Sequence, residues 1–99
     1  MTEASSQVIG SVLDVLIINK RGLHARASAK FVQMAESFPD TQITVSKGGE
    51  TVGGLSIMGL MLLAAGPGTN IKIAASGPRA DEAVRALKRL VDERFGEEE

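Results

Sequence analysis

The chain has no cysteine, no tryptophan and no tyrosine, and its only aromatic residues are three phenylalanines. Without cysteine, the protein has neither disulfide bonds to stabilise its fold nor a thiolate for catalysis. Three phenylalanines do not form a platform on which nucleic-acid bases could stack. No apolar run approaches the ~20 residues of a membrane-spanning helix, and no signal-peptide pattern begins the sequence. We therefore expect a cytoplasmic protein that binds neither nucleic acid nor membrane.

What remains is an ordinary globular composition, with 43% hydrophobic and 23% charged residues and a formal net charge of −1. A chain of 99 residues is long enough for one hydrophobic core and too short for two. We expect a flexible lead-in over residues 1–10, one folded domain over 11–96 and an acidic tail over 97–99. The slightly negative net charge argues against a general nucleic-acid binder.

The charges are distributed unevenly along the chain. Residues 20–30 carry four cations and no acid, whereas seven of the twelve acids lie in residues 81–99. A local basic patch attracts phosphate groups or acidic protein surfaces. It can equally be a solvated loop, so charge alone does not define a site. The cations are Lys20, Arg21, Arg26 and Lys30.

Hydrophobic periodicity predicts the element order β-α-β-β-α-β-α. Alternating apolar residues indicate strands near 12–18, 43–46, 50–52 and 71–75, and helical spacing indicates helices near 27–38, 57–65 and 78–95. The pair Gly48-Gly49 is typical of a two-residue hairpin turn. Strands with one alternating face and three helices predict an α+β fold in two layers, an antiparallel sheet with the helices on one face.

The second predicted helix is apolar on nearly every side, unlike a helix that packs one face on a sheet. Either both of its faces are covered, or its outer side is an exposed contact surface. A two-layer fold cannot bury all of these residues, and it favours the contact surface. Ser56 precedes this helix and is well placed to cap it, because a serine hydroxyl accepts a hydrogen bond from a free backbone amide.

The single histidine, His24, lies where the loop after the first strand enters the first helix. A helix N-terminus disfavours imidazolium and leaves the ring neutral and nucleophilic. Free backbone amides at the same place form an anion site suited to a phosphoryl group. Arg26 follows two residues later and can neutralise phosphate oxygens with its planar guanidinium. These residues predict a histidine that serves as a covalent nucleophile.

Other interpretations of His24 remain open at this point. A lone loop histidine is more often a surface residue without a role. A metal site would need more ligands than one histidine without cysteine or a nearby carboxylate pair. A hydrolytic triad lacks a second base, an orienting aspartate beside the histidine and a nucleophile elbow. We expect no metal and no cofactor.

Two separated segments resemble the HPr family of histidine-containing phosphocarriers from the bacterial phosphoenolpyruvate-dependent phosphotransferase system. Residues 19–32 read NKRGLHARASAKFV and are similar to the family's active-site segment. Residues 55–61 read LSIMGLM and are similar to its regulatory-serine segment at the expected distance downstream. The order of the elements also fits, so the resemblance extends over about residues 12–95.

This resemblance implies a role for each matching residue. His24 corresponds to the histidine phosphorylated on Nδ1 by enzyme I, and Arg26 to the arginine that balances the phosphate. Ser56 corresponds to the serine modified by HPr kinase/phosphorylase in some lineages. The family's antiparallel sheet has the strand order 1-4-2-3. The surface expected to dock on enzyme I and on EIIA-type acceptors comprises Ala25, Lys30, Ile57, Met58 and Met61.

One position departs from the family pattern. Ala27 stands where many members have proline, whose fixed φ suits the first turn of a helix. Alanine also forms helix well, so we expect phosphotransfer to persist. We also expect the protein to be a monomer. The Ala-Ser pair and the downstream segment look more like regulatory proteobacterial members, including the nitrogen-related branch. The alternative functions are a non-catalytic module that binds a kinase or transcription regulator, and a domain that binds a small anion.

Overall fold

The computed structural model describes residues 10–99, and their elements follow the expected order with a short 3-10 turn at the end. The predicted lead-in over residues 1–10 lies outside the described residues except for Gly10, which begins the first described strand. The strands are β2 (Gly10–Leu16), β3 (Gln42–Lys47), β4 (Glu50–Gly53) and β5 (Asn70–Ser76). The helices are α1 (Ala25–Glu36), α2 (Ile57–Leu62), α3 (Ala80–Asp92) and the 3-10 turn η1 (Arg94–Gly96).

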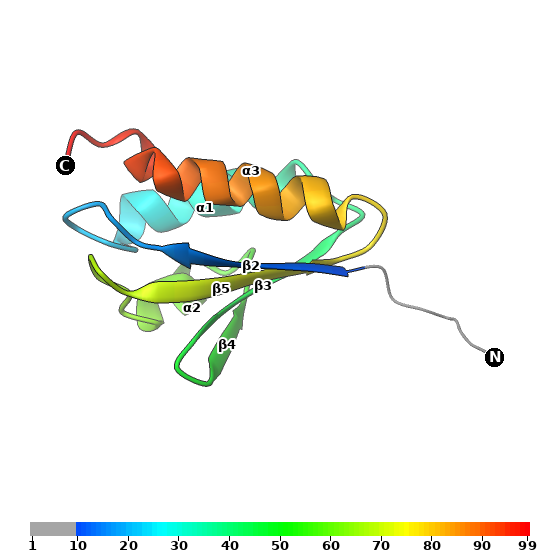
Figure 1. Cartoon of the computed structure of the whole chain (residues 1–99), viewed down its shortest axis with the longest axis horizontal. Coiled ribbons are helices and arrows are strands. Elements are labelled where there is room, and N and C mark those ends of the chain that lie inside the picture. Colours follow the sequence, from blue (N-terminus) through cyan, green and yellow to red (C-terminus); the bar gives the residue numbers. More distant parts are fainter. Residues whose placement is uncertain (1–9) are drawn as a thin grey trace.

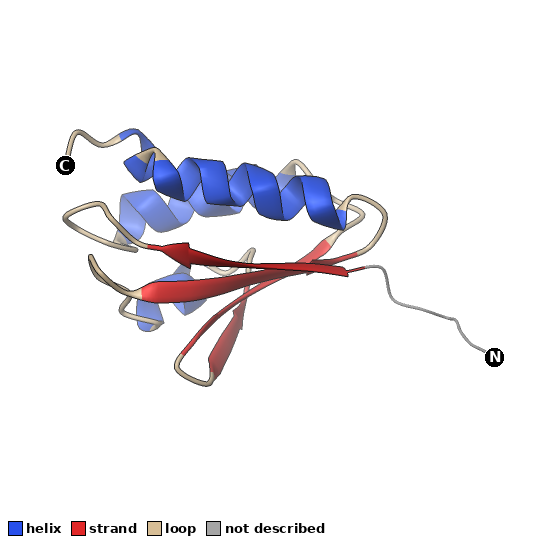
Figure 2. Ribbon diagram, in the orientation of Figure 1, coloured by secondary structure: helices blue, strands red, loops and turns tan. Residues whose placement is uncertain are grey.

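The four strands form one antiparallel sheet in the order β2-β5-β3-β4, which confirms the expected order 1-4-2-3. Lys47 pairs with Glu50 across the β3–β4 hairpin. Its two turn residues, Gly48 and Gly49, have φ angles of 57° and 92°, the left-handed region that a tight hairpin turn requires. Figure 2 shows the sheet as one layer, with α1 and α3 as a second layer over one of its faces.

The core lies between the sheet and the helices. Val15 pairs with Ile71 and Val45 pairs with Ile73 on adjacent strands, and all four are at most 2% exposed. Phe31 of α1 and Leu87 of α3 pack over them without exposure. α1 and α3 run side by side along the sheet (Figure 1). The open-faced α+β sandwich predicted from the sequence is therefore confirmed.

The helices end earlier than the periodicity predicts. α1 ends at Glu36 rather than near residue 38, and α2 ends at Leu62 rather than at residue 65. α3 ends at Asp92, although Phe95 further along is fully buried. The backbone leaves the helix because Arg94 and Phe95 adopt left-handed φ angles of 58° and 54°. No helix among residues 10–99 has the length and apolar character needed to cross a membrane.

Candidate phosphorylation site

His24 is the N-cap residue of α1, as expected. Its backbone is extended (φ −76°, ψ −178°), and its carbonyl accepts the hydrogen bond of Ser28 N–H at 2.8 Å. The side chain does not cap the helix, so the ring projects from the end of α1 and is 19% exposed. The amides of a first helical turn have no partner within the helix and carry its partial positive charge. An anion bound to the ring would lie close to them.

The imidazole of His24 is not isolated. Its Nε2 is hydrogen-bonded to Oε2 of Glu97, a residue 73 positions away in the sequence. The other carboxylate oxygen of Glu97, Oε1, accepts a hydrogen bond from Asn19 Nδ2 at 3.0 Å. Asn19 is completely buried, and its Nδ2 also donates to the carbonyl of Gly22 at 2.9 Å. These three side chains join the loop before α1 to the C-terminal segment.

The environment of Glu97 favours its ionised form. Burial opposes ionisation, since the side chain is only 16% exposed. The hydrogen bonds from His24 and Asn19 outweigh this effect, and the positive charge of Arg21 acts in the same direction. As a result the pKa of Glu97 is lowered from its ordinary value of 4.5. The group beside the histidine is therefore a carboxylate at neutral pH.

A buried anchor places Glu97 against the histidine. Phe95 has no exposed surface, and its carbonyl accepts a hydrogen bond from Lys30 Nζ at 2.7 Å. Gly96 follows with a φ of 80°, and the Glu97 N–H donates to the carbonyl of Arg94 at 2.8 Å. The left-handed residues of η1 therefore turn the chain back from the end of α3 toward the start of α1.

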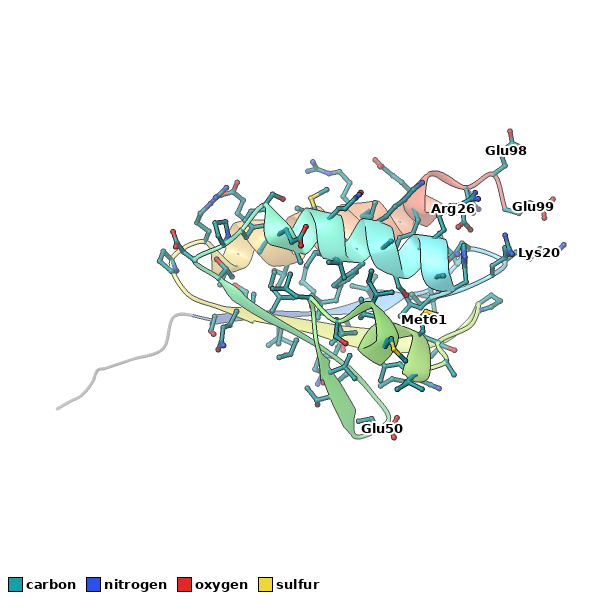
Figure 3. All side chains as sticks on the ribbon, turned by 180° about the vertical axis from the view of Figure 1, so that it is seen from behind. Lys20, Arg26, Glu50, Met61, Glu98 and Glu99 are labelled. Carbon is teal, nitrogen blue, oxygen red and sulfur yellow. The ribbon has the colours of Figure 1, made fainter. Side chains whose placement is uncertain are left out.

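Glu97 also lines a pocket that three cations and three acids share. Arg26 is exposed on the first turn of α1, and it lines this pocket of about 480 Å³ together with Lys20, Arg21 and the C-terminal residues 97–99. The Nζ of Lys20 lies 3.3 Å from the carboxylate of Glu99. Figure 3 shows Lys20, Arg26 and the C-terminal segment together at one end of the molecule. Residues 10–99 hold no group of three or more acidic or histidine side chains that could ligate a metal ion.

Ser56 is the N-cap of α2, and its Oγ accepts a hydrogen bond from the Gly59 N–H at 2.9 Å. Its side chain is exposed. Leu60 is the only residue of α2 that is buried, and large apolar side chains cover the rest of the helix. Figure 3 shows Met61 on this outer surface, on the side of α2 turned away from the sheet. The exposed fractions are 62% for Leu55, 39% for Ile57, 72% for Met58, 41% for Met61 and 74% for Leu62.

The structure thus places the residues predicted from the sequence in two groups. His24, Ala25 and Arg26 lie together at the start of α1, whereas Ser56, Ile57, Met58 and Met61 lie on α2, which packs against α1. Lys30 is half-buried and is engaged with Phe95. Sequence reasoning gave no role to Asn19 or Glu97. Asn19 lies in the quoted segment 19–32 but acts through Glu97, and Glu97 is 73 positions from the histidine.

Comparison with known proteins agrees with this geometry. The family model for the PTS HPr component phosphorylation site matches residues 13–93. A phosphocarrier protein HPr from Cupriavidus necator is 50% identical over 86 residues, covering 87% of this chain and 96% of that protein. An HPr from Pseudomonas aeruginosa is 50% identical over 88 residues, covering 88% and 97%. The crystal structure of an HPr from Thermoanaerobacter tengcongensis superimposes with a TM-score of 0.85 at 43% identity, covering 90% of this chain and 99% of that one.

An open-faced sandwich with a histidine at the N-terminus of its first helix defines the class: a phosphocarrier component of the phosphotransferase system. The chain belongs to the HPr family. Its partners are accordingly proteins of that system. The match of the family model includes His24, Arg26 and Ser56, and it ends before Glu97.

Proposed function

We propose that the chain accepts a phosphoryl group from phospho-enzyme I, originally from phosphoenolpyruvate, on His24 and passes it to an EIIA-type protein. The observation that carries this proposal is the part-exposed imidazole at the N-cap of α1. One ring nitrogen, Nε2, is engaged with Glu97. Nδ1 has no hydrogen-bond partner among residues 10–99, so it is the nitrogen left for the phosphoryl group.

The charge of the bound phosphoryl group would be balanced from two directions. The backbone amides of the first turn of α1 present partial positive charge at the ring. Arg26 lies on the same turn with an exposed side chain, and a guanidinium can donate two parallel hydrogen bonds to phosphate oxygens. Lys20 and Arg21 line one pocket with Arg26, and the glutamates at positions 97–99 line it as well and offset part of their charge.

The exposed apolar side of α2 is the proposed docking surface for enzyme I and for the acceptor. Met58 and Leu62 are each more than 70% exposed, and methionine-rich apolar surfaces adapt to more than one partner. Ala25, Lys30, Ile57 and Met61 complete the surface next to His24. Phosphorylation of Ser56 by an HPr kinase/phosphorylase would add about −1.5 to −2 charges beside this surface and would weaken docking.

Intact-mass analysis tests the proposal directly. The protein is incubated with phosphoenolpyruvate, Mg²⁺ and an enzyme I of proven activity, and its mass is measured at neutral and acidic pH. We expect one phosphoryl group that is lost in acid and that does not form on His24→Ala. Absence of any gain would contradict phosphotransfer and would favour the non-catalytic regulatory module. In that case Ala27, which replaces the usual proline at the start of α1, would be the first residue to restore.

A further inference from the structure

We infer that Glu97 is a positioning residue for phosphoryl transfer: its carboxylate holds the Nε2–H of His24, so that Nδ1 presents a free lone pair to the donor. This inference rests on the proposed function. It concerns a residue outside the segment matched by the family model, which ends at residue 93. Two observations carry it: the contact between Glu97 and His24, and the buried structure that holds Glu97 in place.

The direction of the hydrogen bond follows from the chemistry of its two partners. An ionised carboxylate has no proton and can only accept. Since Glu97 is ionised at neutral pH, the proton in its contact with His24 must lie on Nε2. A neutral imidazole carries one proton, so its other nitrogen, Nδ1, then has the free lone pair. The ring nitrogens point away from each other, and the carboxylate does not obstruct Nδ1.

Glu97 is held in place more firmly than an exposed acidic residue would be. Its second oxygen accepts from Asn19, which has no exposed surface. Phe95, two residues before it, is fully buried and tied to Lys30. The left-handed conformation of Phe95 (φ 54°) is unfavourable for a bulky residue, and such strain persists only where the surrounding structure imposes it. These contacts therefore hold the Glu97 carboxylate against the histidine.

The same contact serves the reaction in both directions. The Nδ1 lone pair attacks phosphorus, the Nδ1–P bond forms, and the bond from phosphorus to the donor breaks with its electron pair leaving on the donor. The ring then carries one positive charge with the proton still on Nε2, beside the carboxylate of Glu97. When an acceptor attacks, the Nδ1–P bond breaks and its electron pair returns to Nδ1. The neutral ring with Nε2–H is restored, and no proton needs to leave it.

The contact can be tested without any enzyme, by ¹⁵N NMR of the His24 ring in the unphosphorylated protein at pH 9, where an ordinary imidazole is neutral. We expect a directly observed Nε2–H signal, slowed in its exchange with water by the hydrogen bond. Glu97→Ala should lose this signal to exchange and should populate both ring tautomers. Glu97→Gln should retain it, because an amide oxygen still accepts. Glu93→Ala is the matched control, since Glu93 is exposed, does not line this pocket, and its side chain makes no hydrogen bond or ion pair within residues 10–99.

The same variants are then compared in the rate of phosphorylation by phospho-enzyme I. We expect Glu97→Ala to be slower by about tenfold, the effect of losing one hydrogen bond to a charged group. Glu97→Gln should fall between, because it keeps the hydrogen bond and loses the charge, and Glu93→Ala should match the wild type. A wild-type ring protonated on Nδ1, or a Glu97→Ala variant that transfers at the wild-type rate, would overturn the inference. If an active enzyme I leaves the wild type unmodified, the proposed function fails instead, and the ring-proton measurement separates the two failures.

Discussion

A Cβ atom on Gly22 would lie 2.2 Å from the carbonyl oxygen of Ala65, far inside van der Waals contact. Gly22 adopts a left-handed φ of 62°, and the next residue, Leu23, donates its N–H to the same carbonyl at 3.0 Å. The loop that ends at His24 is thus held against the segment after α2 by backbone contacts that leave no space for a side chain. His24 and the end of α2 are placed relative to each other at this point.

Gly22→Ala should therefore destabilise the protein by about 3 kcal/mol or more, since it adds a backbone clash to the strain of a left-handed alanine. Gly48→Ala is the matched control. Gly48 has a similar φ of 57°, but a Cβ there would meet nothing within 4 Å, so only the strain of about 1 kcal/mol remains. Urea denaturation measures both values. Equal losses in the two variants would contradict the close approach of Gly22 to Ala65.

Asn19 is expected to be essential to the structure of the loop. Its amide donates to both Gly22 and Glu97 from a fully buried position, and an unpaired buried acceptor costs about 1–3 kcal/mol. Asn19→Ala should lower the free energy of unfolding by about that amount. Asn19→Asp should lower it further above pH 5, because it places a second carboxylate against Glu97. An Asp variant as stable as wild type at pH 7 would show that Asn19 and Glu97 are not in contact.

The sequence predicted the elements whose signals are local. Alternation placed β2 and β5, and the glycine pair predicted the β3–β4 hairpin, because side-chain period and turn chemistry act within a few residues. The end of α3 was predicted too late for a physical reason. Phe95 continues the apolar stripe of that helix and is buried, yet it reaches the core from a left-handed turn after the helix has ended. Periodicity reports burial, and here burial continues beyond the helix.

The candidate site was predictable only where its residues are neighbours in the sequence. His24 and Arg26 share a short motif with a helix start, so both could be recognised from neighbouring residues. Glu97 reaches His24 across 73 positions, and Asn19 reaches Glu97 across 78. A sequence alone does not report such a separation, and acidic residues after a helix resemble an ordinary solvated tail. No acidic residue is near His24 in the sequence, and the fold places the carboxylate of Glu97 beside it.

The lowered pKa of Glu97 predicts a pH dependence of stability with a definite sign. Its pKa in the folded state lies below the ordinary value of 4.5, so the ionised group favours the folded state. That contribution is complete above the unfolded-state pKa and is lost as the pH falls through the folded-state pKa. The difference in unfolding free energy between wild type and Glu97→Ala should therefore shrink between about pH 5 and pH 3. A difference that stays constant or grows over this range, measured by urea denaturation, would contradict the assignment.

Two substitutions of Ser56 should separate an effect on the free energy of unfolding from an effect on partner binding. Ser56→Ala removes the acceptor for the Gly59 N–H and should cost about 1 kcal/mol. Ser56→Asp keeps an acceptor and adds favourable negative charge at the start of α2, so the fold should be retained. Its charge lies beside the proposed docking surface, however, and phosphorylation by enzyme I should slow. Transfer at the wild-type rate in Ser56→Asp, measured with phosphoenolpyruvate and enzyme I, would exclude this form of regulation.

The proposed docking surface is tested by Met58→Gln. Met58 is 72% exposed, so replacing it should change the free energy of unfolding by less than about 0.5 kcal/mol. If its side chain enters an apolar pocket on enzyme I, the KM for this protein as substrate should rise by about tenfold with kcat little changed, which is the pattern of lost uniform binding. Val12→Thr is the control, because Val12 is 55% exposed on β2, next to Leu13, which packs against the core, and so on the open face of the sheet. A comparable rise in KM for both variants would point to a general surface effect, whereas a rise for Met58→Gln alone places enzyme I on α2.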